Sequence, residues 1–138
     1  MNQMAQNVCD FIDLKGEKYE VVDDRTIRFS YRGENMPAIH INLRFDEDGK
    51  SASLLCYSIA KIKDDNVFSK AKAQAVCNDL NLRWRWTRFF IDTDDEFTAA
   101  CDAVIDTYTA GEECLELVNR VASIIDDSYP LIMQSVWA

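Results

Sequence analysis

Glycine and proline are scarce in this sequence, with four glycines and two prolines among 138 residues. The glycines are scattered, so neither a G-x-G-x-x-G nor a G-x-x-x-x-G-K phosphate-binding loop is present. Gly16, Gly33, Gly49 and Gly111 fall between segments of regular hydrophobic pattern, where turns are expected. Such short connections, and a length that suits one hydrophobic core, predict a single domain over residues 1–138.

Histidine is scarcer still, because His40 is the only one. Any Ser-His-Asp or Cys-His catalytic site would have to use it. His40 alternates with Ile39 and Ile41, which predicts a strand residue that faces solvent. The acidic turn at residues 46–49 lacks the later bidentate glutamate of a calcium loop. We therefore expect a protein that is not an enzyme and that has no catalytic residue, metal site or cofactor.

Paired cysteines are also lacking. The number is odd and no C-x-x-C pair occurs among Cys9, Cys56, Cys77, Cys101 and Cys114. Most stand beside apolar residues, as reduced thiols do in the core of a cytoplasmic protein. Residues 1–16 have neither the basic start nor the apolar stretch of a signal peptide. No apolar run approaches the ~20 residues of a membrane span. We expect a cytoplasmic protein without membrane association.

Basic residues are few in one part of the chain. The whole sequence has 15 bases and 24 acids, a net charge of −9. Residues 92–138 contain eleven acids and a single base, Arg120, so the acidic excess belongs to this final third. This balance argues against binding to nucleic acid, which needs a basic surface. We hypothesise that the acidic segment complements the basic residues 83–88, within the chain or across a dimer.

The hydrophobic periodicity predicts an α+β domain. Apolar residues recur at helical spacing over residues 4–12 and 68–82, and again after Gly111. The last helix is expected to break or kink at Pro130, which cannot donate a backbone hydrogen bond. Period-two alternation predicts strands over residues 27–31, 39–45, 84–91 and 97–105, and segments next to turns predict two more over residues 19–22 and 52–62. The expected architecture is an antiparallel sheet with helices packed on it.

Two groups of residues carry a family resemblance. The first comprises Cys77-Asn78-Asp79-Leu80-Asn81, Arg85-Trp86, Phe89 and Ile91-Asp92, and the second comprises Gly111-Glu112-Glu113-Cys114, Arg120, Asp127 and Tyr129. Together they resemble the YbjN-like domains. The resemblance implies a type III secretion chaperone-like fold with the order α-β-β-β-α-β-β-α, to which residues 19–22 would add a short strand. It also implies a bacterial, cytosolic protein of sensory or regulatory type, and it supplies no catalytic residues.

The segment from Trp84 to Phe90 is the most unusual in the chain, because bulky side chains occur at both parities of the expected strand. A strand that is apolar on both faces is usually covered on both sides. We therefore take Trp84, Trp86, Arg88 and Phe90 as a candidate interface. The leading interpretation is a non-enzymatic interaction or regulatory domain that forms a homodimer. The alternatives are a chaperone-like protein that binds an extended client segment and, less favoured, a small-molecule sensor.

Overall fold

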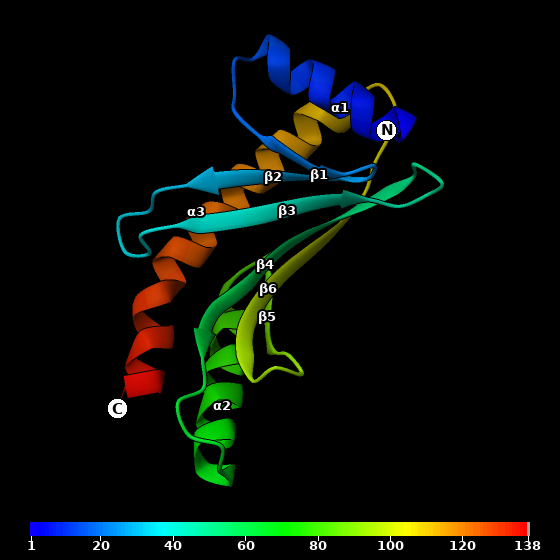
Figure 1. Cartoon of the computed structure of the whole chain (residues 1–138). Coiled ribbons are helices and arrows are strands. Elements are labelled where there is room, and N and C mark those ends of the chain that lie inside the picture. Colours follow the sequence, from blue (N-terminus) through cyan, green and yellow to red (C-terminus); the bar gives the residue numbers. More distant parts are fainter. Residues whose placement is uncertain (138) are drawn as a thin grey trace.

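The computed structural model describes residues 1–137. Over these residues the chain forms three helices and six strands in the order α-β-β-β-β-α-β-β-α (Figure 1). The elements are α1 (Gln3–Leu14), β1 (Glu20–Asp23), β2 (Thr26–Tyr31), β3 (Ile39–Phe45), β4 (Ser51–Lys61), α2 (Val67–Arg83), β5 (Arg88–Ile91), β6 (Glu96–Val104) and α3 (Ala110–Trp137).

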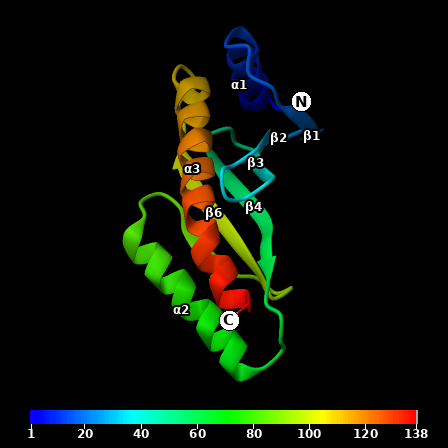
Figure 2. The same cartoon turned by 90° about the vertical axis from the view of Figure 1, so that its left-hand side faces the viewer.

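The strands form one antiparallel sheet with the order β1-β2-β3-β4-β6-β5. All three helices lie on the same side of it (Figure 2), with α2 beside β5 and α3 against β3 and β4. The expected α+β class is confirmed. The short strand expected at residues 19–22 is also present, as β1, which pairs with β2 at the edge of the sheet.

Alternation along the strands builds the core. In β3, Ile39, Ile41, Leu43 and Phe45 are buried, whereas His40 and the other intervening side chains are on the opposite side. These buried side chains join the apolar stripes of the helices in one hydrophobic cluster. Because the helices cover one face only, the sheet keeps a second face without a helix, which we call the open face.

The expected strand at residues 84–91 is shorter than predicted. Helix α2 continues to Arg83, Trp84 caps its C-terminal end, and β5 begins only at Arg88. Trp86 has a φ angle of 64°, in the left-handed region, so the backbone turns here and cannot continue a strand. The prediction failed because Trp84, Trp86 and Phe90 are spaced as in a strand, although Trp84 and Trp86 lie in the connection before β5.

Of the break or kink expected at Pro130, the break is wrong, because α3 runs unbroken from Ala110 to Trp137. Proline has no N–H to donate to the carbonyl of Asp126, four residues earlier. The side-chain amide of Asn35 takes over this role and donates to the Asp126 carbonyl at 3.1 Å. The hydrogen bond lost at the proline is thus replaced from the β2–β3 loop, which helps the helix to continue.

The carboxylate of Asp126 also binds the β2–β3 loop. The carboxylate accepts backbone N–H groups of Glu34 at 3.0 Å, Asn35 at 2.9 Å and Met36 at 2.9 Å. These hydrogen bonds, that of Met36 foremost, lower the pKa of Asp126 against the opposing effect of burial. Gly33 lies so close that a Cβ atom there would collide with the carboxylate. Residues 33–36 therefore form a backbone cradle for one helix side chain.

Candidate interaction surfaces

The structure divides the four candidate interface residues between two sides of the sheet. Arg88 and Phe90 flank the buried Phe89, so they lie on the open face. Trp84 and Trp86 precede the strand and lie beside α3, where Arg120 contacts the Trp86 ring. Trp84 packs partly buried against the core, whereas Trp86 is 52% exposed. The four residues therefore belong to two distinct surfaces.

A single row of paired residues crosses the whole open face. The register joins, from β1 to β5, Glu20, Arg28, Asn42, Leu55, Ala100 and Arg88. The row begins with an acid at one edge, ends with a base at the other, and has an apolar centre. Tyr57 and Phe90 flank this centre and are 54% and 37% exposed. The open face is therefore partly apolar at its centre, with a charged residue at each end of this row.

Ion pairs stand at both ends of the open face. Arg28 binds Glu20 at 3.1 Å, and Arg88 binds Asp102 at 2.8 Å. Ser53 donates a second hydrogen bond to Asp102 at 2.8 Å. The Ser53 hydroxyl, followed by Arg88, lowers the pKa of Asp102 although burial opposes the shift. One acid of the C-terminal third thus meets the basic segment within the chain, as one form of the charge hypothesis expects.

The two edges of the sheet differ in their accessibility. At β5, the side-chain amide of Asn81 accepts the N–H of Phe89 at 2.7 Å and donates to its carbonyl at 3.0 Å. A helix side chain therefore occupies the backbone groups that another strand would need. At the other edge all four residues of β1 are exposed, including Val21 and Val22. Edge-to-edge pairing is consequently hindered at β5 and open at β1.

A second surface is a groove between the α2–β5 connection and α3, which we call the tryptophan groove. It encloses about 350 Å³ and is lined by Arg83, Trp84, Arg85, Trp86, Arg120, Ser123, Ile124 and Asp127. The guanidinium carbon of Arg120 lies 4.9 Å from the centre of the Trp86 ring, within cation–π distance. Arg120 also binds Glu116 at 2.8 Å, one turn earlier. The lining thus combines three guanidinium groups with aromatic surface.

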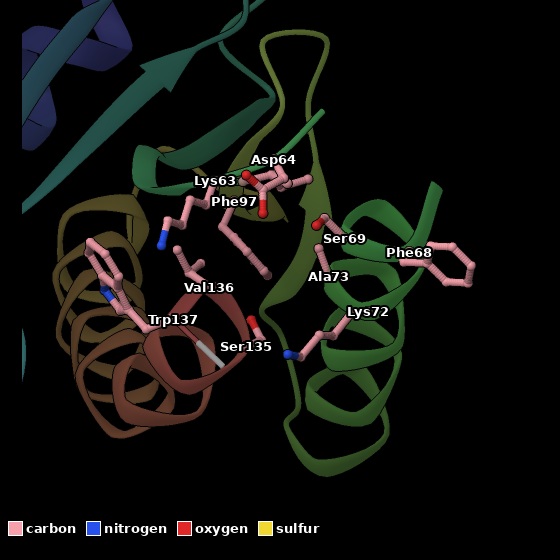
Figure 3. Close-up of a pocket in the computed structure, with 11 residues that line it drawn as sticks. Lys63, Asp64, Phe68, Ser69, Lys72, Ala73, Phe97, Ser135, Val136 and Trp137 are labelled. Atoms are coloured by element: carbon pink, nitrogen blue, oxygen red, sulfur yellow. The ribbon is translucent and has the colours of Figure 1, made fainter. Parts of the chain in front are cut away.

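Another cavity, of about 220 Å³, lies between the start of α2 and the end of α3 (Figure 3). Lys63 and Asp64 bring opposite charges to it, and Phe68 points away from it toward solvent. Lys63 lies over the Trp137 ring at 5.1 Å. This mixed lining indicates no single class of ligand.

His40 and the cysteines take up ordinary surface and core positions. His40 is exposed on the open face, as predicted, and its Nδ1 lies 2.8 Å from the Ser30 hydroxyl. All five cysteines are unpaired and buried, and burial raises the pKa of Cys77 to about 11. Within residues 1–137, no three His, Cys, Asp or Glu side chains gather as metal ligands would. Over the same residues, no helix combines the length and apolar character needed to cross a membrane.

Sequence reasoning missed two contributors to these surfaces. Arg120 was visible as the single base of the acidic third and as part of a family motif, but its place on Trp86 depends on how α3 crosses the sheet. Asn81 was visible only as part of a family motif, and its bidentate contact depends on α2 lying beside β5. Neither contact has a local sequence signal, because the partners belong to different elements.

This arrangement defines a class of fold, an antiparallel sheet backed by helices on one side. It is shared with the crystal structure of YbjN, "a putative transcription regulator from E. coli". The two structures have a TM-score of 0.64 over 90% of this chain and 87% of the other, at 9% sequence identity. At this identity the likeness concerns the fold alone.

The family is shown by a separate comparison. The model of the YbjN family, described as "Putative bacterial sensory transduction regulator", matches residues 5–133. The chain therefore belongs to the YbjN family, as the resemblance of its motifs indicates. No curated protein sequence matches it significantly.

Proposed function

We propose that this protein is a non-enzymatic regulatory domain that acts in the cytoplasm through protein contacts, with a second copy of itself as its first partner. The regulatory character follows the description of the family. A cytoplasmic location accords with five buried cysteines that form no disulfide. The observation that carries the proposal is the open face, which has exposed aromatic side chains and an ion pair at each end.

The register of the sheet places Glu20 and Arg88 at opposite ends of one row on the open face. In a two-fold dimer with the symmetry axis along the strands, between β3 and β4, the β1 end of one copy faces the β5 end of the other. Glu20 then faces Arg88 of the other copy, because both stand in the same row. In the same row, Leu55 of β4 faces Asn42 of the other copy, because the axis passes between β3 and β4. The candidate interface thereby retains Arg88 and Phe90, on the open face.

Sedimentation equilibrium of wild type and charge-swapped variants tests this arrangement. Glu20→Arg and Arg88→Glu should each weaken dimerisation about tenfold, which corresponds to about 1.4 kcal/mol, because each change places like charges at two symmetric contacts. The double variant should recover most of the lost affinity, since it restores opposite charges. Phe90→Ala should weaken the dimer without changing its salt dependence.

Trp86→Ala is the matched control, because it truncates an exposed aromatic residue on the other side of the sheet. It should leave the dimer constant unchanged. A wild-type protein that is monomeric at high concentration would remove the proposal. If Phe90→Ala and Trp86→Ala change the dimer constant equally, the open face is not the dimer interface.

A second candidate function is chaperone-like binding of an extended client segment, and the exposed edge at β1 favours it. An added strand would pair with free backbone groups of residues 20–23, while Val21 and Val22 supply apolar contacts. Lysine at both valines should abolish client capture and leave dimerisation intact. If the double variant still captures the client, β1 is not the binding edge.

A further inference from the structure

The tryptophan groove carries chemistry that an interaction through the open face does not use. Its lining has three guanidinium groups, from Arg83, Arg85 and Arg120, and one carboxylate, from Asp127. Guanidinium groups bind carboxylates and other oxyanions through two parallel N–H donors. Arg120 is paired with Glu116, so the excess of positive charge over Asp127 comes from Arg83 and Arg85, and this charge favours an anionic occupant.

The groove also offers a flat apolar wall. Trp86 is 52% exposed, and Arg120 lies over its ring, while Trp84 and Ile124 complete the lining. The volume of about 350 Å³ lies near the lower end of the range for small-molecule sites. A planar or short apolar body fits this wall, with the charged end directed to the arginines.

The backbone around Trp86 supplies an independent observation. Trp86 adopts a left-handed conformation that is unfavourable for a bulky residue, and such strain concentrates at binding and switch sites. The indole N–H of Trp84, which lines the groove, is buried without a hydrogen-bond partner among the described residues, and so is the hydroxyl of Thr87, which lies outside the lining. A strained turn with two unpaired polar groups is unusual for a purely structural connection.

We propose that the tryptophan groove is a binding site for a small organic carboxylate with an apolar body. The carboxylate contacts the guanidinium groups of Arg83 and Arg85, and the apolar part lies against Trp86. The groove lies between the end of α2 with its connection to β5 and α3, so the bound ligand lies between these elements. The site stands on the helix side of the sheet, so it does not depend on the dimer proposed for the open face.

Calorimetric titration of the full chain tests the site with benzoate, phenylacetate, indole-3-acetate and succinate. Phenethylamine serves as a cation of similar shape to phenylacetate, and acetate as an anion without the apolar body. At least one of the larger carboxylates should bind with one-to-one stoichiometry, and phenethylamine and acetate should bind at least tenfold more weakly. Tryptophan fluorescence should change on binding, because two of the three tryptophans line the groove.

Arg85→Gln and Trp86→Ala should each reduce the affinity at least tenfold. Arg32→Gln removes the same charge from an exposed site in the β2–β3 loop and should leave affinity unchanged. Thermal melting of each variant separates lost binding from lost folding. Failure of all four carboxylates to bind, equal binding of phenethylamine, or equal losses in Arg32→Gln and Arg85→Gln would each overturn the proposal.

Discussion

Replacement of Asp126 by alanine is the most direct test of how the fold is held together. The carboxylate accepts three backbone N–H groups from Glu34, Asn35 and Met36 at 2.9–3.0 Å. The first two N–H groups are exposed and regain water when the carboxylate is lost, whereas that of Met36 is partly buried. An unpaired buried donor costs about 1–3 kcal/mol, and exposed ones cost less.

We therefore expect Asp126→Ala to lower the free energy of unfolding by about 2 kcal/mol. For a chain of this length that loss corresponds to a fall in Tm of about 6–8 °C. Asp126→Asn keeps one acceptor oxygen but no charge, so its loss should be intermediate. Urea denaturation followed by circular dichroism measures all three stabilities, and hydrogen exchange should be faster at the Met36 amide of the alanine variant.

Asp127→Ala is the matched control, because it removes the same charge and the same side chain one position further along α3 from an exposed site. It should change stability by less than about 0.5 kcal/mol. If the two alanine variants differ by no more than this amount, the carboxylate does not secure the β2–β3 loop and the reasoning is refuted.

Other expected outcomes follow from single contacts. Asn81→Leu uncovers the backbone of β5, so stability should fall by about 1–2 kcal/mol and light scattering should show aggregation that wild type lacks. Gly111→Ala should destabilise by about 1–2 kcal/mol, measured by thermal melting, because its Cβ would lie 2.6 Å from the Phe11 ring; a raised Tm would contradict this. The folded-state pKa values of Asp102 and Asp126 are lowered, so both carboxylates stabilise the fold above the unfolded pKa of about 3.9. Stability should fall as the pH drops through the lower folded-state values, less steeply in Asp126→Ala; equal slopes in acid titrations would count against the contribution of Asp126.

Much of the fold follows from periodicity in the sequence. Alternation over residues 39–45 predicts both the strand β3 and the side on which His40 lies, because successive side chains in a strand point to opposite faces. Helical spacing likewise predicts α1, α2 and α3. Such patterns lie within one segment of the sequence, so they can be recognised without knowing which other segments pack against it.

The candidate site could be predicted only in part. The sequence shows an unusual run of arginine and aromatic residues in this segment. It does not show the left-handed turn at Trp86, because nothing in the alternation of residues 84–91 distinguishes a turn from a strand. As a result one expected surface became two, the open face with Arg88 and Phe90 and the groove with Trp84 and Trp86.

The sequence by itself determined the class of fold, the composition of its core and the concentration of acid in the last third of the chain. Tertiary structure alone decided which distant groups meet. Asn35 reaches the carbonyl that Pro130 leaves free, and Arg120 reaches Trp86, because α3 crosses the sheet at one particular angle and height. The physical reason is that periodicity reports whether a side chain is buried, whereas its contacts depend on packing between elements that are far apart in the chain.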